Sequence, residues 1–474
     1  MSAIPGDIET DTQPPMAIPL RHFVVGLAFL LVGAFVGALA PMGVIPGVST
    51  LAHVHLLLAG WVCITIMGAM TQFVPVWSGT TLHSRRLSTI QLWTVTAGLA
   101  GFVGCLFGGF YDWLPVFGGL LLLGFWTFVY NVGRTLYGVR PWDVTERHFA
   151  LALGFFLLVT LFGLILAVGF TRPVLSDLPI TRSALRSSHA TLAVFGAVLT
   201  TVFGALYQLG TMFTQTELRG LDHHLRRIEE IGYPVGVLAL AAGRLFAVPE
   251  IGRIGALLVA VGVGAMGLVL GRRLLETEVA WNPMLRRYAV AAASMVVWAI
   301  LTIPSWVVSP LGLAATFGSP AGTHLLLFGV VGFVVTGTLY HIVPFIAWVH
   351  RYSDRLGLET VPMIDDLYDD RLAGGDFVAL LVGTAVLVGV ETVGTVRING
   401  ASIASDPLLT VFGGLISVLG FTLFAANLVL TIRRHGGQSI PGVGAVSDLV
   451  ARAASTDDSE TSDPPARAPH EDRE

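Results

Sequence analysis

The chain has 474 residues, of which 54% are hydrophobic and only 12% are charged, and its mean hydropathy is +0.75. These values lie far outside the range of soluble globular proteins. The composition therefore excludes a water-soluble enzyme and predicts an integral membrane protein with several spans. No nucleotide-binding or nucleic-acid-binding motif is present. The formal net charge is −4, and all 27 basic residues are arginines.

Two polar segments flank the apolar part of the chain. Residues 1–20 contain three acidic residues and no basic residue before Arg21, so they do not have the form of a signal peptide and predict a cytoplasmic N-terminal tail. Residues 435–474 are rich in Gly, Ser, Asp and Pro, a composition typical of a disordered, acidic cytoplasmic tail. Residues 21–434, between these two segments, are predicted to form the membrane domain.

Twelve apolar windows in this domain are long enough to cross about 30 Å of hydrocarbon as α-helices. In chain order they fall at about 22–42, 51–77, 88–109, 113–136, 148–171, 185–212, 232–249, 252–274, 288–309, 321–348, 376–396 and 408–432. Gly, Pro or a charged residue interrupts the seventh and eleventh windows. The windows predict an all-α integral membrane fold with twelve transmembrane helices.

Arginines are concentrated in alternate loops of this arrangement. One set of loops and chain ends contains 18 arginines, and the opposite set contains only Arg172, Arg182, Arg186, Arg253 and Arg397. Positively charged loops stay in the cytoplasm. We therefore expect a multi-pass protein of the plasma membrane, in contact with lipid, with both termini cytoplasmic. Helices 2, 6 and 10 then run from the outer to the inner face.

The second, sixth and tenth windows share a repeated pattern of glycines. Two glycines lie eight residues apart in each window, and the first glycines of successive windows are separated by 136 and 133 residues: Gly60 and Gly68, Gly196 and Gly204, Gly329 and Gly337. Such spacing indicates an internal repeat. It predicts three pseudo-symmetric repeats of four helices, at about 21–147, 148–287 and 288–434.

Each of these windows also begins with histidine at the outer face. His53 and His189 precede their first glycine by seven residues, and His55 and His324 precede theirs by five. A neutral imidazole at the end of a membrane helix is a good ligand for a metal. We expect His55 and His324, which share a repeat position, to be the axial ligands of a low-spin heme. His53 points about 200° away from His55 on the helix, which leaves His53 and His189 for a second metal site or for backbone hydrogen bonds.

Over about residues 20–435, this arrangement resembles subunit I of the heme-copper oxidases. The resemblance implies a redox protein of the cytochrome c oxidase and nitric oxide reductase type, with b-type heme, copper, a small redox protein or quinol as electron donor, and other oxidase-type subunits. It also implies that Arg397, on the outer side after helix 11, contacts heme propionates, and that His53 is near a cofactor. Gly322 stands where the family has its high-spin heme ligand, and the seventh window lacks the histidine pair that binds copper. We therefore expect electron transfer through a bis-histidine heme beside an incomplete oxygen- or nitric oxide-reducing centre.

Two other interpretations remain open. A run in the second window is similar to the helix-2 signature of the NnrS family, which are heme- and copper-containing membrane proteins associated with nitric oxide stress: His53, His55, Gly60, Gly68, Pro75, Trp77, Ser78 and Gly79. A transporter built on the same threefold repeat would need no heme. Two charged residues inside membrane windows, Arg244 and Glu391, are expected to pair with each other or to serve function.

Overall fold

The computed structural model of the protein describes residues 14–395, 397–398, 401–402 and 407–436. Most of these residues are helical. The α-helices are α1 (Ala17–Leu39), α2 (Ser49–His55), α3 (Ile64–Trp77), α4 (Arg85–Gly108), α5 (Leu114–Tyr137), α6 (Val144–Val168), α7 (Arg182–Thr191), α8 (Thr200–Thr214), α9 (Leu221–Leu245), α10 (Pro249–Leu275), α11 (Pro283–Val308), α12 (Phe333–Arg351), α13 (Asp370–Thr395) and α14 (Pro407–His435).

Short elements occupy the connections between these helices. They are the 3-10 turns η2 (Ala40–Met42), η4 (Tyr111–Trp113), η6 (Leu313–Ala315), η7 (Pro320–Gly322), η9 (Ser353–Arg355) and η10 (Ile364–Leu367), and a two-residue antiparallel pair, β1 (Arg397–Ile398) with β2 (Ala401–Ser402). The chain is thus an all-α protein apart from one minimal hairpin in its described part.

In the described residues, eleven helices are long and apolar enough to cross a membrane, as expected for a multi-pass membrane protein. The seventh expected window, 232–249, overlaps α9, which begins eleven residues earlier than expected, at Leu221, and ends at Leu245. The first half of α9 carries Arg226, Arg227, Glu229 and Glu230. These charges concealed the start of the helix in the hydropathy pattern, and they keep α9 out of the eleven apolar helices.

Three eight-residue π-helical segments continue the repeated pattern of the sequence. They are η3 (Leu56–Cys63), η5 (Leu192–Leu199) and η8 (Leu325–Gly332), and each begins four residues before the first glycine of its window. The continuous helices α2–η3–α3, α7–η5–α8 and η8–α12 are hereafter called the first, second and third central helices. π-helical turns are rare in proteins, and those that occur are often found at functional sites. Three of them at one repeat position therefore indicate that a functional site lies near this part of the bundle.

The first glycine of each window lies where a neighbouring helix approaches closely. A Cβ atom added there would fall within 2.9 Å of a side chain on α1, α6 or α11: 2.7 Å for Gly60 and Phe29, 2.8 Å for Gly196 and Phe155, and 2.6 Å for Gly329 and Ser294. Each central helix therefore packs on the helix that precedes it in the same way. Close backbone packing of this kind is typical of membrane helices.

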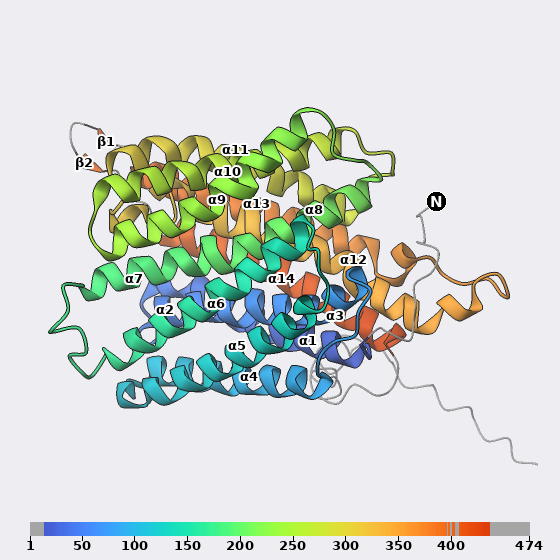
Figure 1. Cartoon of the computed structure of the whole chain (residues 1–474), viewed down its shortest axis with the longest axis horizontal. Helices are drawn as coiled ribbons and strands as arrows, with labels where there is room; N and C mark the ends of the chain where they lie inside the picture. The colour runs from blue at the N-terminus through green and yellow to red at the C-terminus, as the bar shows by residue number, and fades with distance from the viewer. Residues whose placement is uncertain (1–13, 396, 399–400, 403–406, 437–474) are drawn as a thin grey trace, which may run out of the picture.

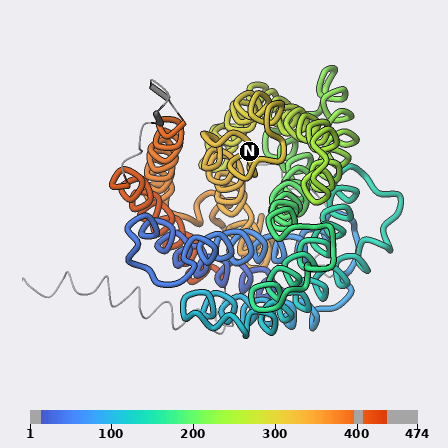
Figure 2. Tube along the Cα trace, turned by 90° about the vertical axis from the view of Figure 1, so that its left-hand side faces the viewer, coloured from blue at the N-terminus to red at the C-terminus, as the bar shows by residue number. Residues whose placement is uncertain are grey.

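The helices lie side by side and form one bundle (Figure 1). Viewed along the helices, the chain runs round the bundle from α1 to α14, and these two helices pack against each other (Figure 2). The three central helices meet around a small apolar cavity of about 70 Å³, which Thr65, Ala205 and Leu339 help to line.

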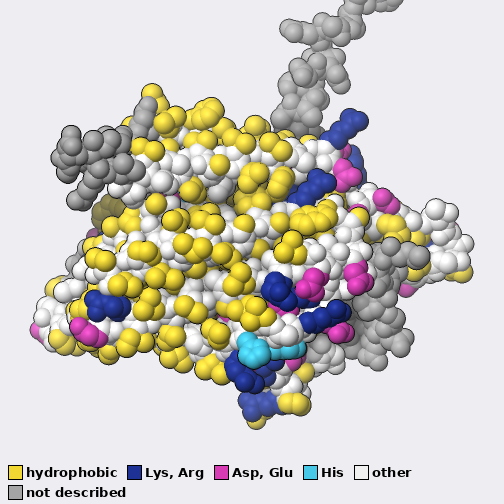
Figure 3. All heavy atoms as spheres, turned by 90° about the horizontal axis from the view of Figure 1, so that it is seen from above, with side chains coloured by type: hydrophobic (Ala, Val, Ile, Leu, Met, Phe, Trp, Pro, Cys, Tyr) yellow, Lys and Arg dark blue, Asp and Glu magenta, His cyan; other side chains and the backbone are white. Residues whose placement is uncertain are grey.

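The surface of the bundle is suited to lipid. Large apolar side chains such as Leu123, Leu268 and Leu419 are about half exposed. In the view of Figure 3, hydrophobic side chains cover the middle of the molecule and most charged side chains gather at the end where α1 begins.

Candidate functional site

The four histidines indicated by the sequence all lie at one end of the central helices. His53 and His55 belong to α2, His189 belongs to α7, and His324 immediately precedes η8. Figure 1 shows α2 and α7 at the end of the bundle away from the beginning of α1. The common depth expected from the sequence is therefore present in the fold.

Each imidazole is held through its Nδ1 atom. The Nδ1 atoms of His53, His55 and His189 lie 2.7, 2.9 and 3.0 Å from the carbonyl oxygens of Gly33, Leu51 and Val159, respectively. A carbonyl oxygen only accepts hydrogen bonds, so Nδ1 must carry the proton in each ring. The Nε2 lone pair is then free, which is the tautomer that a metal-binding histidine needs.

His324 is held by a carboxylate instead of a carbonyl. Its Nδ1 atom lies 2.7 Å from Glu391 Oε1, and its backbone N–H donates to Glu391 Oε2 at 3.1 Å. A carboxylate behind an imidazole fixes the ring and makes Nε2 a stronger electron donor to a metal. Glu391 therefore does not pair with Arg244, contrary to one sequence-based expectation.

Ring contacts connect the first and third central helices below two of the histidines. The His324 ring is connected through Phe328 and Phe421 to Trp61, which lies eight residues after His53 on the first central helix. His55 contacts Phe102 of α4, with ring centroids 5.0 Å apart. No hydrogen bond or ring contact joins two of the four imidazoles in the described residues.

The side chains of all four histidines are partly buried, neither fully enclosed nor fully exposed.

Aromatic side chains lie beneath the His53 and His324 pair. The rings of Phe328, Phe421 and Trp61 follow the His324 ring in a chain of contacts with centroid separations of 5.7, 5.7 and 5.4 Å. The indole N–H of Trp61 is buried and has no hydrogen-bond partner in the described structure. An apolar, aromatic wall with one unpaired donor is typical of a cofactor site.

The second and third central helices meet without an imidazole. Thr191 stands at the repeat position of His55 and His324, five residues before the first glycine of its window, and Gly322 stands at the position of His53 and His189, seven residues before. Arg244, which is buried, donates to Thr191 Oγ1 at 2.6 Å and to the carbonyl oxygens of Thr316 and Ala315 at 2.9 and 3.1 Å. Its guanidinium is thus stabilised by a hydroxyl and by loop carbonyl oxygens, and no acidic side chain pairs with it in the described residues.

Tryptophans fill the same junction. Trp298 and Trp306 are fully buried, and with Phe195 they form a cluster in which ring centroids lie 5.5 to 5.7 Å apart. A Cβ atom on Gly322 would lie 3.2 Å from the Trp298 ring. Bulky side chains therefore fill the junction of the second and third central helices.

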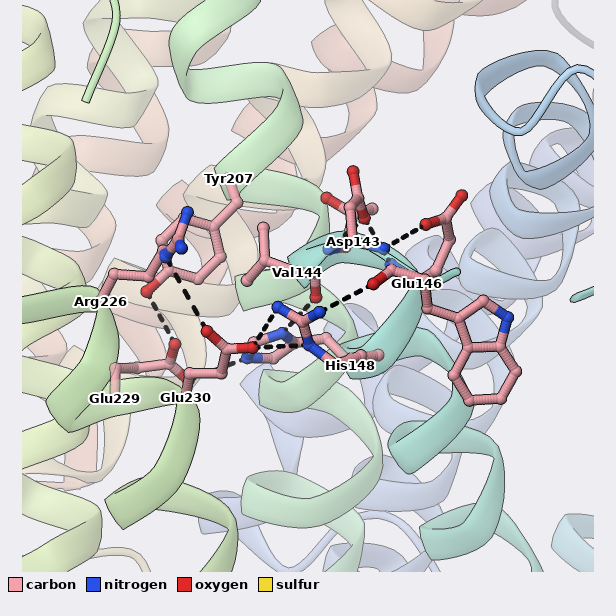
Figure 4. Close-up of polar contacts among 11 residues, drawn as sticks. Asp143, Val144, Glu146, His148, Tyr207, Arg226, Glu229 and Glu230 are labelled. Atoms are coloured by element: carbon pink, nitrogen blue, oxygen red, sulfur yellow. Dashed lines mark hydrogen bonds and ion pairs between the residues drawn. The ribbon is translucent and has the colours of Figure 1, made fainter. Parts of the chain in front are cut away.

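A separate buried polar cluster lies at the opposite end of the bundle, between α6, α8 and α9 (Figure 4). The Glu229 carboxylate accepts from Tyr207 Oη at 2.7 Å and contacts His148 Nε2 at 3.1 Å, and His148 Nδ1 donates to the Val144 carbonyl oxygen at 2.7 Å. Because Nδ1 already uses its proton, the contact between Nε2 and Glu229 requires one further proton that the two groups share. A basic cleft of about 720 Å³ adjoins His148 and is lined by Arg147, Arg226 and Arg227 among others.

Sequence reasoning found the four histidines but missed several of their partners. The sequence indicated Glu391 only as a charged residue inside a membrane window. It gave no indication of Trp298 or Glu229, because aromatic residues are common in apolar helices and Glu229 lies among other charged residues before an interrupted window. Arg397 lies in β1, and the position of its side chain lies outside the described residues. No group of three or more His, Cys, Asp or Glu side chains that could hold a bare metal ion occurs in the described part of the chain.

Comparison with known proteins adds no family to this description. A scan with protein-family models and a search of curated proteins both give no match to the chain.

Proposed function

We propose that the protein is a membrane heme protein that carries electrons, with the heme iron held by His53 and His324. The observation that supports this most strongly is that both imidazoles are fixed through Nδ1 at the same end of the central helices, which leaves Nε2 free in each. Two oriented Nε2 lone pairs are the donor set of a bis-histidine heme.

The number of donors favours heme over a bare ion. Copper and zinc in proteins take three or four protein ligands, and this pair supplies two. Heme iron already has four nitrogen ligands from its macrocycle and needs only two axial ones. When bound, a six-coordinate heme supplies one-electron oxidation and reduction.

The residues of the chain prepare the site for that group. The Gly33 carbonyl holds the His53 ring, and Glu391 holds the His324 ring and donates negative charge to it. The aromatic wall formed by Phe328, Phe421 and Trp61 keeps water from the inner side of the site. A b-type heme has no covalent bond to its protein. This type suits the site, because no cysteine is among the hydrogen-bond partners of the two imidazoles in the described residues.

The larger arrangement belongs to the same proposal. We take the twelve apolar windows as spans in three four-helix repeats, with both termini cytoplasmic in a plasma membrane, so the heme is near the outer face. A small redox protein or a quinol would then deliver electrons there. The packed junction around Trp298 and Arg244 supports electron transfer without the oxygen-reducing centre of the heme-copper oxidases.

Heme measurement on the purified protein tests the proposal. We expect a bis-imidazole low-spin spectrum that is lost in both His53→Gly and His324→Gly, because a six-coordinate heme cannot persist with one axial ligand removed. Added imidazole should restore the spectrum in both variants. His83→Ala, which removes an exposed histidine outside the site, is the control and should leave the spectrum unchanged.

Other outcomes would favour the alternatives. A protein that never contains heme would contradict the proposal and favour a transporter. A protein that binds copper and heme and responds to nitric oxide would favour a function like that of the NnrS family. Cyanide-sensitive oxygen uptake by the purified chain would show that a catalytic centre forms despite the packed junction.

A further inference from the structure

We infer that the cleft between α6 and α9, beside His148, binds the phosphate headgroup of an anionic phospholipid. The cleft lies at the end of the bundle opposite the candidate heme site. The proposed orientation of the bundle places this end at the cytoplasmic face, where basic pockets between membrane helices attract anionic lipids. Lipid binding at this place depends on that orientation and does not require heme.

The cleft has the size of a ligand site and an excess of positive charge. Its volume is about 720 Å³, and ligand pockets in proteins usually measure about 300–1,000 Å³. The polar side chains that line it are three arginines, two histidines and one carboxylate: Arg147, Arg226, Arg227, His148, His223 and Glu230. Even with both histidines neutral, the guanidinium groups outnumber the carboxylate. Arginine binds phosphate through paired, charge-assisted hydrogen bonds.

Arg227 is the arginine of this cleft that no acidic side chain neutralises. The Glu230 carboxylate accepts from Arg147 Nε at 2.6 Å and lies 3.8 Å from Arg226 Nε (Figure 4). In the described residues, no ion pair or hydrogen bond involves the exposed Arg227 guanidinium. The other carboxylate on this turn, Glu229, is fully buried and bonds to side chains of α6 and α8 instead. The cleft therefore offers a free cation to an anionic ligand.

Apolar side chains continue from Arg227 along α9. Ile231, Pro234 and Leu238 follow it at intervals of four, three and four residues, so they lie on one face of the helix. Ile231 and Pro234 still line the cleft, and Ile231 and Leu238 are 63% and 48% exposed. The stripe extends about 16 Å from the arginine toward the middle of the bundle.

The facing side of α6 has the same pattern. Leu151, Gly154 and Leu158 follow Arg147 at the same three intervals. Leu151 lines the cleft, Gly154 has open space beside it, and Leu158 is exposed. Two helices thus each present an arginine at the polar end and an apolar stripe beyond it. A phospholipid has this arrangement of a charged headgroup and an acyl chain, whereas a soluble phosphate compound would leave the stripes uncovered.

The third repeat has an equivalent cleft in which the charges are balanced. Arg286 occupies the repeat position of Arg147, since each directly precedes the side chain that packs on the second glycine of a window. The cleft beside Arg286 measures about 340 Å³, and its lining includes two arginines and two aspartates: Arg286, Arg287, Asp365 and Asp370. Only the cleft of the second repeat has a surplus of arginine among these two, so Arg286 is a matched control.

Native mass spectrometry with a defined lipid tests the site. The full chain is released from vesicles of equal parts phosphatidylglycerol and phosphatidylcholine, and the lipids that stay bound are identified and titrated. We expect the parent to retain phosphatidylglycerol and Arg227→Gln to bind it about fivefold more weakly, the usual contribution of one arginine near an anionic lipid. Arg286→Gln should bind as the parent does. Glu230→Gln should bind more tightly, because it removes the carboxylate that competes for the arginines.

Soluble phosphates distinguish the source of the headgroup. Inorganic phosphate and glycerol 3-phosphate, at the concentration of the lipid, should not displace phosphatidylglycerol, and Ile231→Ser should weaken its retention, because the acyl chain contacts the stripe. Displacement by glycerol 3-phosphate would overturn the choice of a lipid in favour of a soluble ligand. Equal retention by the parent, Arg227→Gln and Glu230→Gln would overturn the site. Heme content, measured on the same samples, should be unchanged in all of these variants, so failure of the lipid site is distinguishable from failure of the proposed function.

Discussion

At the scale of single residues, the site depends on what stands behind each imidazole. Three rings donate Nδ1–H to a backbone carbonyl, and the fourth donates to a carboxylate. The carbonyl partner of His53 and that of His189 belong to a neighbouring helix, so these two rings are oriented only when the bundle is assembled. The free Nε2 atoms are a property of the packing and not of the histidine residue alone.

The glycine behind His53 provides a residue-scale prediction. Gly37→Ala should displace the His53 ring, because the added methyl group would overlap it, and the hydrogen bond to Gly33 would be lost. We expect heme affinity to fall about 10- to 100-fold, the usual effect of disturbing a partner of a metal-ligating histidine. Heme titration of the purified apoprotein measures this. Gly154→Ala, which meets no atom within 4 Å, should bind heme as the parent does; equal affinity in both variants would contradict the role assigned to Gly37.

At the scale of elements, buried polar groups tie helices together at the end opposite the histidines. Glu229 joins α9 to α6 and α8 through His148 and Tyr207. In the third repeat, Asp376 on α13 binds Arg287 on α11 and Tyr340 on α12 in the matching place. Tyr207 and Tyr340 are 133 residues apart, the separation of the repeated glycines. Polar ties of this kind specify which helices pack together where apolar contacts are interchangeable.

Removal of this tie in the second repeat should be costly. Glu229→Ala leaves His148 Nε2 and Tyr207 Oη buried and unpaired, so we expect a loss of about 3 kcal/mol in the free energy of unfolding. Glu229→Gln keeps a hydrogen-bonding group and should lose less. Thermal unfolding in detergent compares these variants with Glu230→Ala, which breaks only the partly exposed contacts to Arg147 and Arg226 and should cost less than about 1 kcal/mol. Equal melting temperatures for the Glu229 and Glu230 variants would argue against the tie.

At the scale of the whole molecule, charge orients the bundle. Arginines are concentrated at the end where α1 begins, and the histidine end has few of them, as Figure 3 shows for one face. Because positive loops are retained in the cytoplasm, the four histidines should lie toward the outer face. In the proposed function, electrons would then reach the heme from that side of the membrane.

Single cysteines in exposed loops test the orientation. Val44 and Leu313, 61% and 51% exposed, lie at the histidine end, and Leu358, 85% exposed, lies in the loop after η9 at the other end. A membrane-impermeant maleimide applied to whole cells should label Val44→Cys and Leu313→Cys, and should label Leu358→Cys only after lysis. The native Cys63 and Cys105 are buried, so the parent protein is the control. Labelling of Leu358→Cys in intact cells would reverse the assigned topology.

The sequence by itself determined the all-α membrane class, the positions of the eleven long apolar helices of the described residues and the glycine register. Hydropathy and spacing carry that information because both are local along the helix. The extent of α9 was missed, since the charges of its first half face polar partners such as His148 and Arg147 that come from another helix. A hydropathy window cannot represent such a pairing.

The groups that hold the imidazoles were decided only by the tertiary structure. Glu391 lies 67 residues after His324, yet its carboxylate accepts from His324 Nδ1. The carbonyl oxygens that hold His53 and His189 belong to α1 and α6, which are separate helices. Packing also brings Trp298 onto Gly322, where the second and third central helices meet. Helix order around a ring is set by packing between helices distant in sequence, and no single helix encodes it.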